Sequence, residues 1–287
     1  ELLWSADEVL DIDVTPDLSY CLSLRGLARQ AAIANGVSYE DRYRAKLPEP
    51  VEGGHPVVLE SDRCPAFVAL TIEGIDPTAA SPAWMVDRLR ASGVRSISLP
   101  VDVTNYVMLE SGQPLHAYDA AKLRGPIRVR LANEGETLRT LDGQDRVLDV
   151  DDLLITDDSG PIGLAGVMGG ESTQVSDTTT SIVLEAAAFA QASVSRTFRR
   201  HSLPSEASKR FERGVDPQLG YAAAKRAAKL LTASGGGEVT AETVVGSAPA
   251  GAHITLRAGL VSSVLGTKVE QEEITRLLSA AAIPVTM

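Results

Sequence analysis

The chain has 287 residues, of which 44% are hydrophobic and 23% are charged. This apolar content excludes a disordered chain, and the length allows one large core or two smaller ones. The formal charge of −11 argues against a protein that binds long stretches of duplex nucleic acid, because such proteins are basic. The two cysteines, Cys21 and Cys64, provide neither a disulfide framework nor a metal set, which favours a reducing cytoplasm. The apolar runs are far shorter than the about 20 residues that a membrane-spanning helix needs.

The N-terminal residues predict part of a small domain. Residues 9–14 are typical of a strand, and apolar residues at helical spacing predict a helix over 19–35 that ends at Asn35-Gly36. Residues 39–54 lose this periodicity and contain several prolines and glycines, so we interpret them as a linker. We therefore expect residues 1–45 to be the second half of a small domain. The start at Glu1, without an initiator Met, indicates a piece of a longer protein.

Residues 55–247 are predicted to form the main domain. The patterns predict strands over 66–72, 127–131, 146–150, 153–156 and 182–185, and helices over 83–92, 190–200 and 217–233. Since strands and helices do not alternate regularly, we expect an α+β fold with β-sheets packed sandwich-like and flanking helices. Residues 252–287 show helical patterns over 256–265 and 271–281, followed by a strand just starting, and predict the first half of another small domain.

Candidate chemistry is concentrated in a few segments. The four histidines are far apart and lack metal-ligand spacing, so no metal site is predicted. The glycine-rich run 163–170 is either a tight turn or a backbone wall approached closely by a ligand. His116 is either a structural hydrogen-bonding group or a functional side chain in a turn. Glu185 is a capping group, a solvated strand end, or a group that reads a polar atom in an apolar pocket. The stretch Arg196–Arg213 carries a local charge of +4, which fits either an ion-paired helix face or a small phosphate-binding surface.

Four segments together carry a family resemblance. They are residues 99–110 (LPVDVTNYVMLE), 112–119 (GQPLHAYD), 165–170 (AGVMGG) and 205–217 (SEASKRFERGVDP). In this order they resemble the β subunit of bacterial phenylalanyl-tRNA synthetase, and the resemblance extends over nearly the whole chain. It implies a complete tRNA-editing domain over 55–247, between two partial small helical or winged-type domains, 1–45 and 252–287, each with a nucleic-acid-binding fold.

The resemblance also implies an activity. In this family the whole α2β2 enzyme charges tRNA(Phe) with phenylalanine, and ATP and Mg²⁺ act on the α subunit, so no cofactor is expected in this part of the β subunit. The central β module hydrolyses mischarged tyrosyl-tRNA(Phe). An apolar pocket for a phenyl ring rejects an added hydroxyl only about 10²-fold, whereas a site that hydrogen-bonds this hydroxyl discriminates by about 10⁴–10⁵. A second, polar site therefore supplies the missing selectivity.

Residue roles follow from the matching positions. Glu185 would read the tyrosine phenol, with Ala165 and Gly166 beside the ring, and Gly169 belongs to the same glycine segment. Thr104, Asn105, Pro114 and His116 would form the rim that holds the amino acid and the tRNA 3′ end, and Arg95, Ser205 and Ala207 further lining. For hydrolysis we expect His116 to orient or deprotonate the water, with Asn105 and the amides of 166–170 as oxyanion donors. Arg196, Arg199 and Arg200 are the expected tRNA contacts.

Two departures and two alternatives accompany this interpretation. Ser205 replaces the usual Thr, and Leu18 replaces an Arg of the first domain, so no RNA contact is expected there. One alternative is a structural or tRNA-docking scaffold without editing activity, which the retained pocket residues disfavour. The other is a freestanding deacylase, which the partial domains at both ends disfavour.

Overall fold

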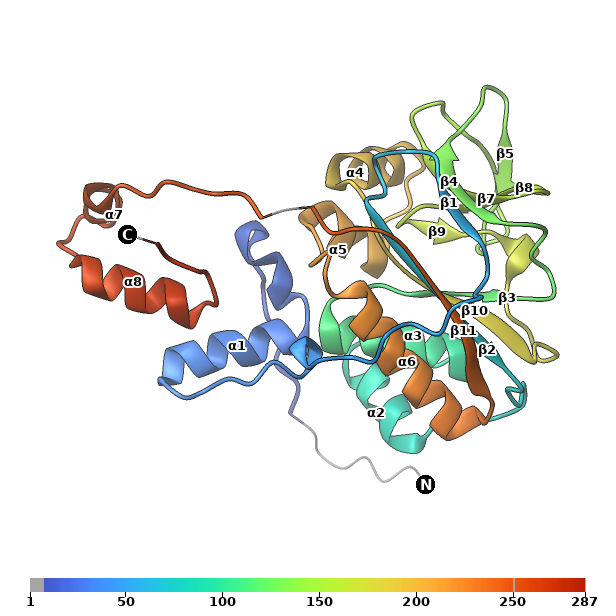
Figure 1. The fold of residues 1–287 in the computed structure, drawn as a ribbon, viewed down its shortest axis with the longest axis horizontal. Helices are drawn as coiled ribbons and strands as arrows, with labels where there is room; N and C mark the ends of the chain where they lie inside the picture. The colour runs from blue at the N-terminus through green and yellow to red at the C-terminus, as the bar shows by residue number, and fades with distance from the viewer. Residues whose placement is uncertain (1–7, 250, 287) are drawn as a thin grey trace.

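The computed structural model describes residues 8–249 and 251–286, and its main body is built around a four-stranded antiparallel sheet (Figure 1). The strand order is β11 (Glu238–Gly246), β2 (Ala66–Glu73), β10 (Ser181–Ala188) and β3 (His116–Asp119). The central strands are long and apolar on both faces, as expected for strands buried from two sides. This sheet therefore separates two hydrophobic cores.

The first core lies between this sheet and a five-stranded sheet. The second sheet has the order β1 (Val57–Leu59), β4 (Ile127–Leu131), β7 (Leu153–Asp157), β8 (Gly160–Leu164) and β9 (Met168–Gly169), with only β1 and β4 parallel. A separate hairpin joins β5 (Thr137–Arg139) to β6 (Asp145–Val147). Fully buried side chains from both sheets, including Phe67, Leu154 and Val183, fill this core.

The second core lies between the four-stranded sheet and a layer of helices. Helices α2 (Ala83–Ala91), α3 (Leu99–Ser111) and α6 (Gly220–Gly235) lie on the face opposite the second sheet (Figure 1). The buried face of α6 consists mainly of alanines, which let the helix backbone approach the sheet closely. Side chains such as Leu70, Met85 and Val107 complete the core.

Strand β10 contributes side chains to both cores. Its successive side chains point to opposite faces, as in any strand. Ile182, Leu184 and Ala186 belong to the helix-side core, whereas Val183 and Ala187 belong to the core between the sheets. This alternation places Glu185 on the face that meets the second sheet.

The remaining helices cover the ends of this body. Helices α4 (Gln191–Arg200) and α5 (Glu206–Arg213) pack on the first core. The N-terminal residues form the short helix η1 (Pro16–Cys21), α1 (Leu24–Asn35) and η2 (Arg42–Arg44), and α1 contacts α3 while η1 contacts α5. A further short helix, η3, spans Glu171–Thr173. Helices α7 (Ala258–Leu265) and α8 (Gln271–Ala280) stand apart from the main body (Figure 1).

The predicted α+β class with stacked sheets and flanking helices is confirmed. The predicted strand over 9–14 is wrong, because residues 8–15 pair with no strand among the described residues. The predicted strand at the end is absent from 283–286, and Met287, like residues 1–7, lies outside the described residues. The predicted helix over 19–35 begins only at Leu24, because the Ser23 hydroxyl caps it by accepting from the Gly26 amide.

Two helices, α3 and α5, have no counterpart among the predicted elements. Helix α3 is apolar on nearly all sides, so it shows no amphipathic period, and α5 is a short, highly charged helix. Residues 39–54, interpreted as a linker, lie against the main body: the Tyr43 hydroxyl donates to Glu110 at 2.6 Å, and the Tyr221 hydroxyl donates to the Pro48 carbonyl at 3.1 Å. Within the described part of the chain, no helix combines the length and apolarity needed to cross a membrane.

The start of α3 depends on one buried carboxylate, Asp102. It accepts hydrogen bonds from the Ser81 hydroxyl at 2.6 Å, the Ser96 hydroxyl at 2.5 Å and the Ile97 amide at 2.8 Å. We expect Asp102→Ala to lower the free energy of unfolding by about 2–3 kcal/mol, because hydrogen bonds to a charged acceptor are lost together. Asp102→Asn keeps the shape and one acceptor, and should cost less. Urea unfolding of both variants tests this, and equal losses would contradict it.

Candidate functional site

A small cavity of about 90 Å³ lies at the edge of the first core, between the two sheets and α5. Such a volume suits a single small group and not a large cofactor. Its apolar lining includes Leu115, Ile155, Leu164, Met168 and Phe211. Six of the residues predicted from the sequence line it: Pro114, His116, Gly166, Gly169, Glu185 and Ala207. The fold therefore brings together residues that are far apart in the chain.

Strand pairing places the two ionisable groups of this cavity side by side. In the register of β3 and β10, His116 lies directly opposite Glu185. Tyr118, two residues after His116, projects to the same face, and the two rings pack edge to face with centroids 4.6 Å apart. The Tyr118 hydroxyl donates a hydrogen bond to Glu185 Oε2. Carboxylate, imidazole and phenol thus form one cluster.

Glu185 is a buried carboxyl group in apolar surroundings. It lies inside β10 and not at its end, so the solvated strand end considered from the sequence is wrong. Burial raises the pKa of Glu185 to about 7, and the hydrogen bond from Tyr118 opposes this shift. Burial beside Glu185 also raises the pKa of Tyr118 and of the neighbouring Cys64. Oε1 of Glu185 has no hydrogen bond to any residue in 8–249 or 251–286, so this oxygen is available to a ligand.

His116 is neutral in this setting. Burial lowers the pKa of His116 to about 4, and its Nε2 is buried with no hydrogen-bond partner among the described residues. Gly169 allows this placement, because a Cβ there would lie 2.5 Å from His116 Cε1. An unpartnered buried nitrogen is costly, so the arrangement is suited to hold a ligand or a water molecule at Nε2.

The glycine-rich segment forms the turn between β8 and β9. Gly166 has φ +70°, and a Cβ there would lie 2.9 Å from the Phe211 ring, so only glycine fits both the turn and the packing. The Val167 and Gly170 amides already donate to the Leu164 and Ile162 carbonyls. Of the expected oxyanion donors, these two are therefore engaged, and the Gly166 amide has no acceptor within the described chain.

Other predicted residues have different positions. Thr104 and Asn105 lie on α3 and do not line the cavity; the Thr104 hydroxyl donates to the Val101 carbonyl of its own helix. Arg95 lies at a separate hollow formed by α2 and the loop that follows it. Ala165 is buried in the first core next to the cavity. Ser205 caps α5, and its hydroxyl also donates to the Val167 carbonyl at 3.1 Å, so it ties α5 to the glycine turn.

The three arginines of α4 in the basic stretch form an ion-paired surface. Arg196 pairs with Asp151 at 2.7 Å and Arg199 with Glu212 at 3.6 Å. Arg200 pairs with the fully buried Asp152 and also contacts Asp149. For these three arginines, the structure favours the ion-paired helix face over the phosphate-binding surface. None of these three arginines lines the cavity.

Tyr118 is a residue of the cavity that the sequence did not predict, although it lies in the motif of residues 112–119. The available signal was its spacing: a residue two positions after His116 on a strand shares its face. The sequence does not predict a strand here, because the segment His116–Asp119 is short and lies close after Pro114. Only the pairing of β3 with β10 shows that the phenol reaches the Glu185 carboxylate.

The residues that line the cavity lie within a domain of a known protein family. The sequence model of the B3/4 domain matches residues 63–236, and the chain belongs to this family. The matched range contains both sheets' central strands and every residue that lines the cavity.

The relatives agree with the resemblance carried by the four motifs. The chain is 53% identical to the phenylalanine–tRNA ligase β subunits of Cutibacterium acnes and of Streptomyces avermitilis, over 99% of this chain. It spans about a third of these relatives' length, 34% and 35%. A crystal structure of an N-terminal fragment of the phenylalanyl-tRNA synthetase β subunit from Pyrococcus horikoshii is 16% identical, with a TM-score of 0.45 over 93% of this chain and 74% of that one. That structural similarity is too weak to carry an argument.

The shifted pKa of Glu185 predicts how stability depends on pH. Its pKa rises from 4.5 to about 7 on folding, so the contribution of its proton is fully present below pH 4.5 and is lost as the pH rises through 7. We therefore expect Glu185→Gln to gain stability relative to wild type between about pH 5 and pH 8, by up to about 3 kcal/mol. His116 shifts in the opposite sense and is unchanged in both proteins, so it cancels in the difference.

Urea unfolding midpoints across this pH range measure the effect. Glu8→Gln, which removes an exposed carboxylate, is the matched control. A difference between Glu185→Gln and wild type that stays constant with pH would contradict the buried, raised pKa.

Proposed function

We propose that this chain is the central part of a phenylalanine–tRNA ligase β subunit and that its cavity hydrolyses mischarged tyrosyl-tRNA(Phe). The editing domain would comprise residues 55–247, with partial neighbouring domains at 1–45 and 252–287. The names of the relatives support the first statement. The observation that carries the second is the Glu185 carboxyl group, buried in an apolar cavity with Oε1 unengaged and His116 opposite it.

Recognition would rest on the contrast between one polar group and an apolar lining. A tyrosine ring entering the cavity would contact Leu164, Met168 and Phe211 and bring its hydroxyl toward Glu185. Phenylalanine would fill the same space but leave Oε1 without a partner. A buried polar group without a partner carries a large cost, so the phenyl ring is disfavoured. Tyr118 would act as a positioning residue, since its hydrogen bond to Oε2 fixes the carboxylate and directs Oε1 to the ligand.

Hydrolysis of the ester needs a placed water molecule and stabilisation of the oxyanion. His116 is neutral at pH 7 and its Nε2 has no partner among the described residues, so with the ring proton on Nδ1 it would accept a hydrogen bond from the water. A group with a pKa of about 4 is a weak base, which favours orientation of the water over proton abstraction in the ligand-free state. The Gly166 amide would be the nearest unused donor for the oxyanion. The ribose hydroxyl of the substrate would be an alternative proton acceptor.

The whole enzyme would supply the remaining functions. Its α subunit, in an α2β2 assembly in the cytoplasm, would charge tRNA(Phe) with ATP and Mg²⁺. No group of three or more His, Cys, Asp or Glu side chains that could hold a metal ion occurs in the described residues. Residues Arg196, Arg199 and Arg200 would contribute to tRNA binding only by exchanging their present carboxylate partners for phosphates.

The first test concerns selectivity. Above pH 7, where the Glu185 carboxyl group is ionised, we expect Glu185→Ala to lose about 10- to 100-fold of the preference for tyrosyl over phenylalanyl ester, because a hydrogen bond to a charged group contributes about 1.5–3 kcal/mol. Tyr118→Phe removes only the positioning hydrogen bond and should lose less. Release of labelled amino acid from tyrosyl- and phenylalanyl-tRNA(Phe) measures both rates. Unchanged discrimination in Glu185→Ala would remove Glu185 from the reading role.

The second test concerns the water. We expect His116→Ala to slow deacylation of tyrosyl-tRNA(Phe) by about 10²-fold or more, the range found for general acid–base groups. His253→Ala, which changes an exposed histidine far from the cavity in the sequence, is the matched control. A normal rate in His116→Ala would exclude it from the chemical step. No release by a folded wild-type chain would favour the scaffold without editing activity.

A further inference from the structure

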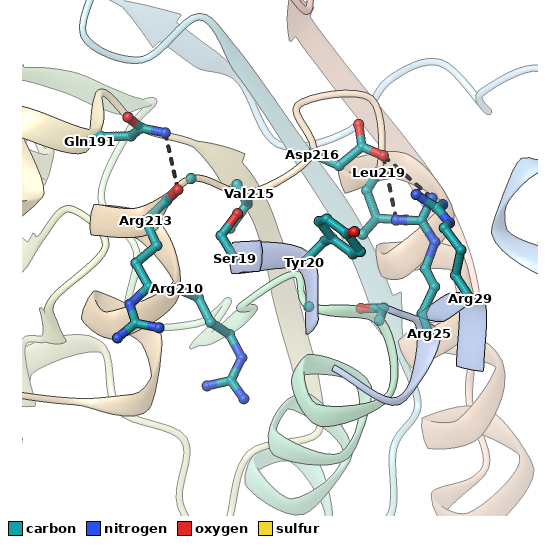
Figure 2. A pocket seen from close by; sticks show the side chains of 13 residues that line it. Ser19, Tyr20, Arg25, Arg29, Gln191, Arg210, Arg213, Val215, Asp216 and Leu219 are labelled. Atoms are coloured by element: carbon teal, nitrogen blue, oxygen red, sulfur yellow. Dashed lines mark hydrogen bonds and ion pairs between the residues drawn. The ribbon is translucent and has the colours of Figure 1, made fainter. Parts of the chain in front are cut away.

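A second hollow, of about 330 Å³, lies where the N-terminal segment meets the main body (Figure 2). Four segments that are distant in sequence form it: residues 19–29, the end of α3, the first residue of α4, and the end of α5 with the loop that follows. Four arginines line it: Arg25, Arg29, Arg210 and Arg213. The only carboxylate in its lining is Asp216.

Two of these arginines are neutralised on one side of the hollow. Arg25 contacts Asp41 through Nη2 at 2.7 Å and Asp216 at 3.4 Å, and this pairing holds the pKa of Asp41 below its usual value. Arg29 contacts Asp41 at 3.3 Å through Nη2, but its Nε is buried with no hydrogen-bond partner in the described part of the chain. Figure 2 shows Arg25 and Arg29 gathered with Asp216 on this side.

The other two arginines extend from α5 on the opposite side (Figure 2). Arg210 donates to the Leu22 carbonyl at 3.1 Å and to Glu206 at 2.6 Å, and its side chain is 5% exposed. Arg213 donates from Nη1 to the Val14 carbonyl at 2.9 Å and has no carboxylate within 4.0 Å among the described residues. Its Nε and Nη2 are therefore unused donors. Ser19, drawn between the two sides, likewise makes no hydrogen bond through its hydroxyl to any described residue.

This arrangement leaves positive charge and donors unmatched. The carboxylates that contact the four guanidinium groups are Asp41, Asp216 and Glu206, one fewer than the cations. Asp41 is moreover shared with Arg44 at 3.7 Å. Like charges held together without equal compensation repel one another, and an anion in the hollow would relieve that repulsion. Arginine is the side chain best suited to oxyanions, because its planar fork offers parallel N–H donors.

Helix α5 connects this hollow to the cavity around Glu185. Ala207 and Phe211, four residues apart, line that cavity, whereas Arg210 and Arg213, three apart, line the hollow. Gly112 lines the hollow and Pro114 lines the cavity, so only Gln113 separates these two lining residues along the chain. The two spaces are thus back to back across one short helix.

We propose that the hollow lined by Ser19 and Arg213, between the N-terminal segment and α5, binds a phosphate group, either free or as the phosphodiester of a single-stranded RNA. Arg213 supplies the principal unused donors, Ser19 a hydroxyl donor, and the remaining arginines a positive surround. Phosphate binding at this hollow does not depend on ester hydrolysis at the cavity. The absence of phosphate binding and the absence of ester hydrolysis are therefore distinguishable results.

The test uses the full chain with inorganic phosphate as the probe, at constant ionic strength set with chloride. We expect saturable phosphate binding, measured by titration calorimetry and as a rise in Tm, and at least about tenfold weaker binding in Arg213→Gln. Arg213→Lys keeps the charge but loses the fork and should bind with intermediate affinity. Arg139→Gln, which removes a half-exposed arginine outside the hollow, is the matched control and should bind normally.

Two further measurements keep the result decisive. Arg213 also donates a hydrogen bond to the Val14 carbonyl, so Ser19→Ala takes the place of Arg213→Gln if that variant does not fold. Ser19→Ala should weaken phosphate binding while leaving Tm in chloride unchanged. A short single-stranded RNA is then added in competition. Displacement of phosphate identifies RNA as the source, and binding of phosphate without displacement identifies a free anion. No saturable binding to the folded wild type, or equal affinity in wild type and Arg213→Gln, would overturn the proposal.

Discussion

The two-faced burial of strand β10 is the constraint on which the rest of the structure depends. It pairs with β2 along its full length and with β3 over half of it, and its alternating side chains enter two different cores. A slip of one residue would exchange the two sets and move Glu185 into the helix layer. The long pairing with β2 therefore fixes the register of β10 as well as the sheet. It decides which side chain of β10 reaches the cavity.

Burial then gives the cavity its chemistry. The same removal from water raises the pKa of Glu185 and lowers the pKa of His116, so both groups are biased toward their neutral forms. Tyr118 is the only described side chain that hydrogen-bonds to this pair, and it engages one oxygen of the carboxylate. The fold holds an acceptor, a donor-capable carboxyl group and an apolar wall within one small space. Under the proposed function, that combination would select a hydroxylated ring over an unsubstituted one.

The distribution of charge is equally a product of tertiary structure. The chain is acidic overall, and its arginines are compensated mostly by carboxylates that are distant in sequence, such as Arg196 with Asp151 and Arg25 with Asp216. In the stretch that is most basic by count, Arg196, Arg199, Arg200 and Arg210 are paired with carboxylates. Unmatched donors appear instead at Arg213 and Arg29, on either side of the hollow between the N-terminal segment and α5. Local net charge therefore does not show which arginines of a basic stretch keep unmatched donors.

Sequence patterns predicted much of the fold. The central strands, α2, α4 and α6 were anticipated because each carries an apolar period or clear boundary residues. Helix α3 was not predicted because it is buried on nearly all sides and shows no amphipathic period. Helix α5 was not predicted because it is short and charged. The strand expected over 9–14 is absent, since alternation alone gives a segment no partner to pair with.

For the site, the sequence by itself determined the residue types and the family, through motifs that contain His116, Gly166 and Ala207, and the place of Glu185 on a strand. The tertiary structure alone decided that Thr104, Asn105 and Arg95 lie outside the cavity and that Tyr118 engages Glu185. The physical reason is the difference in range. Turn residues, caps and periodicity act over a few neighbours, whereas strand register, burial and ion pairing join residues that only the folded chain brings within a few ångströms of each other.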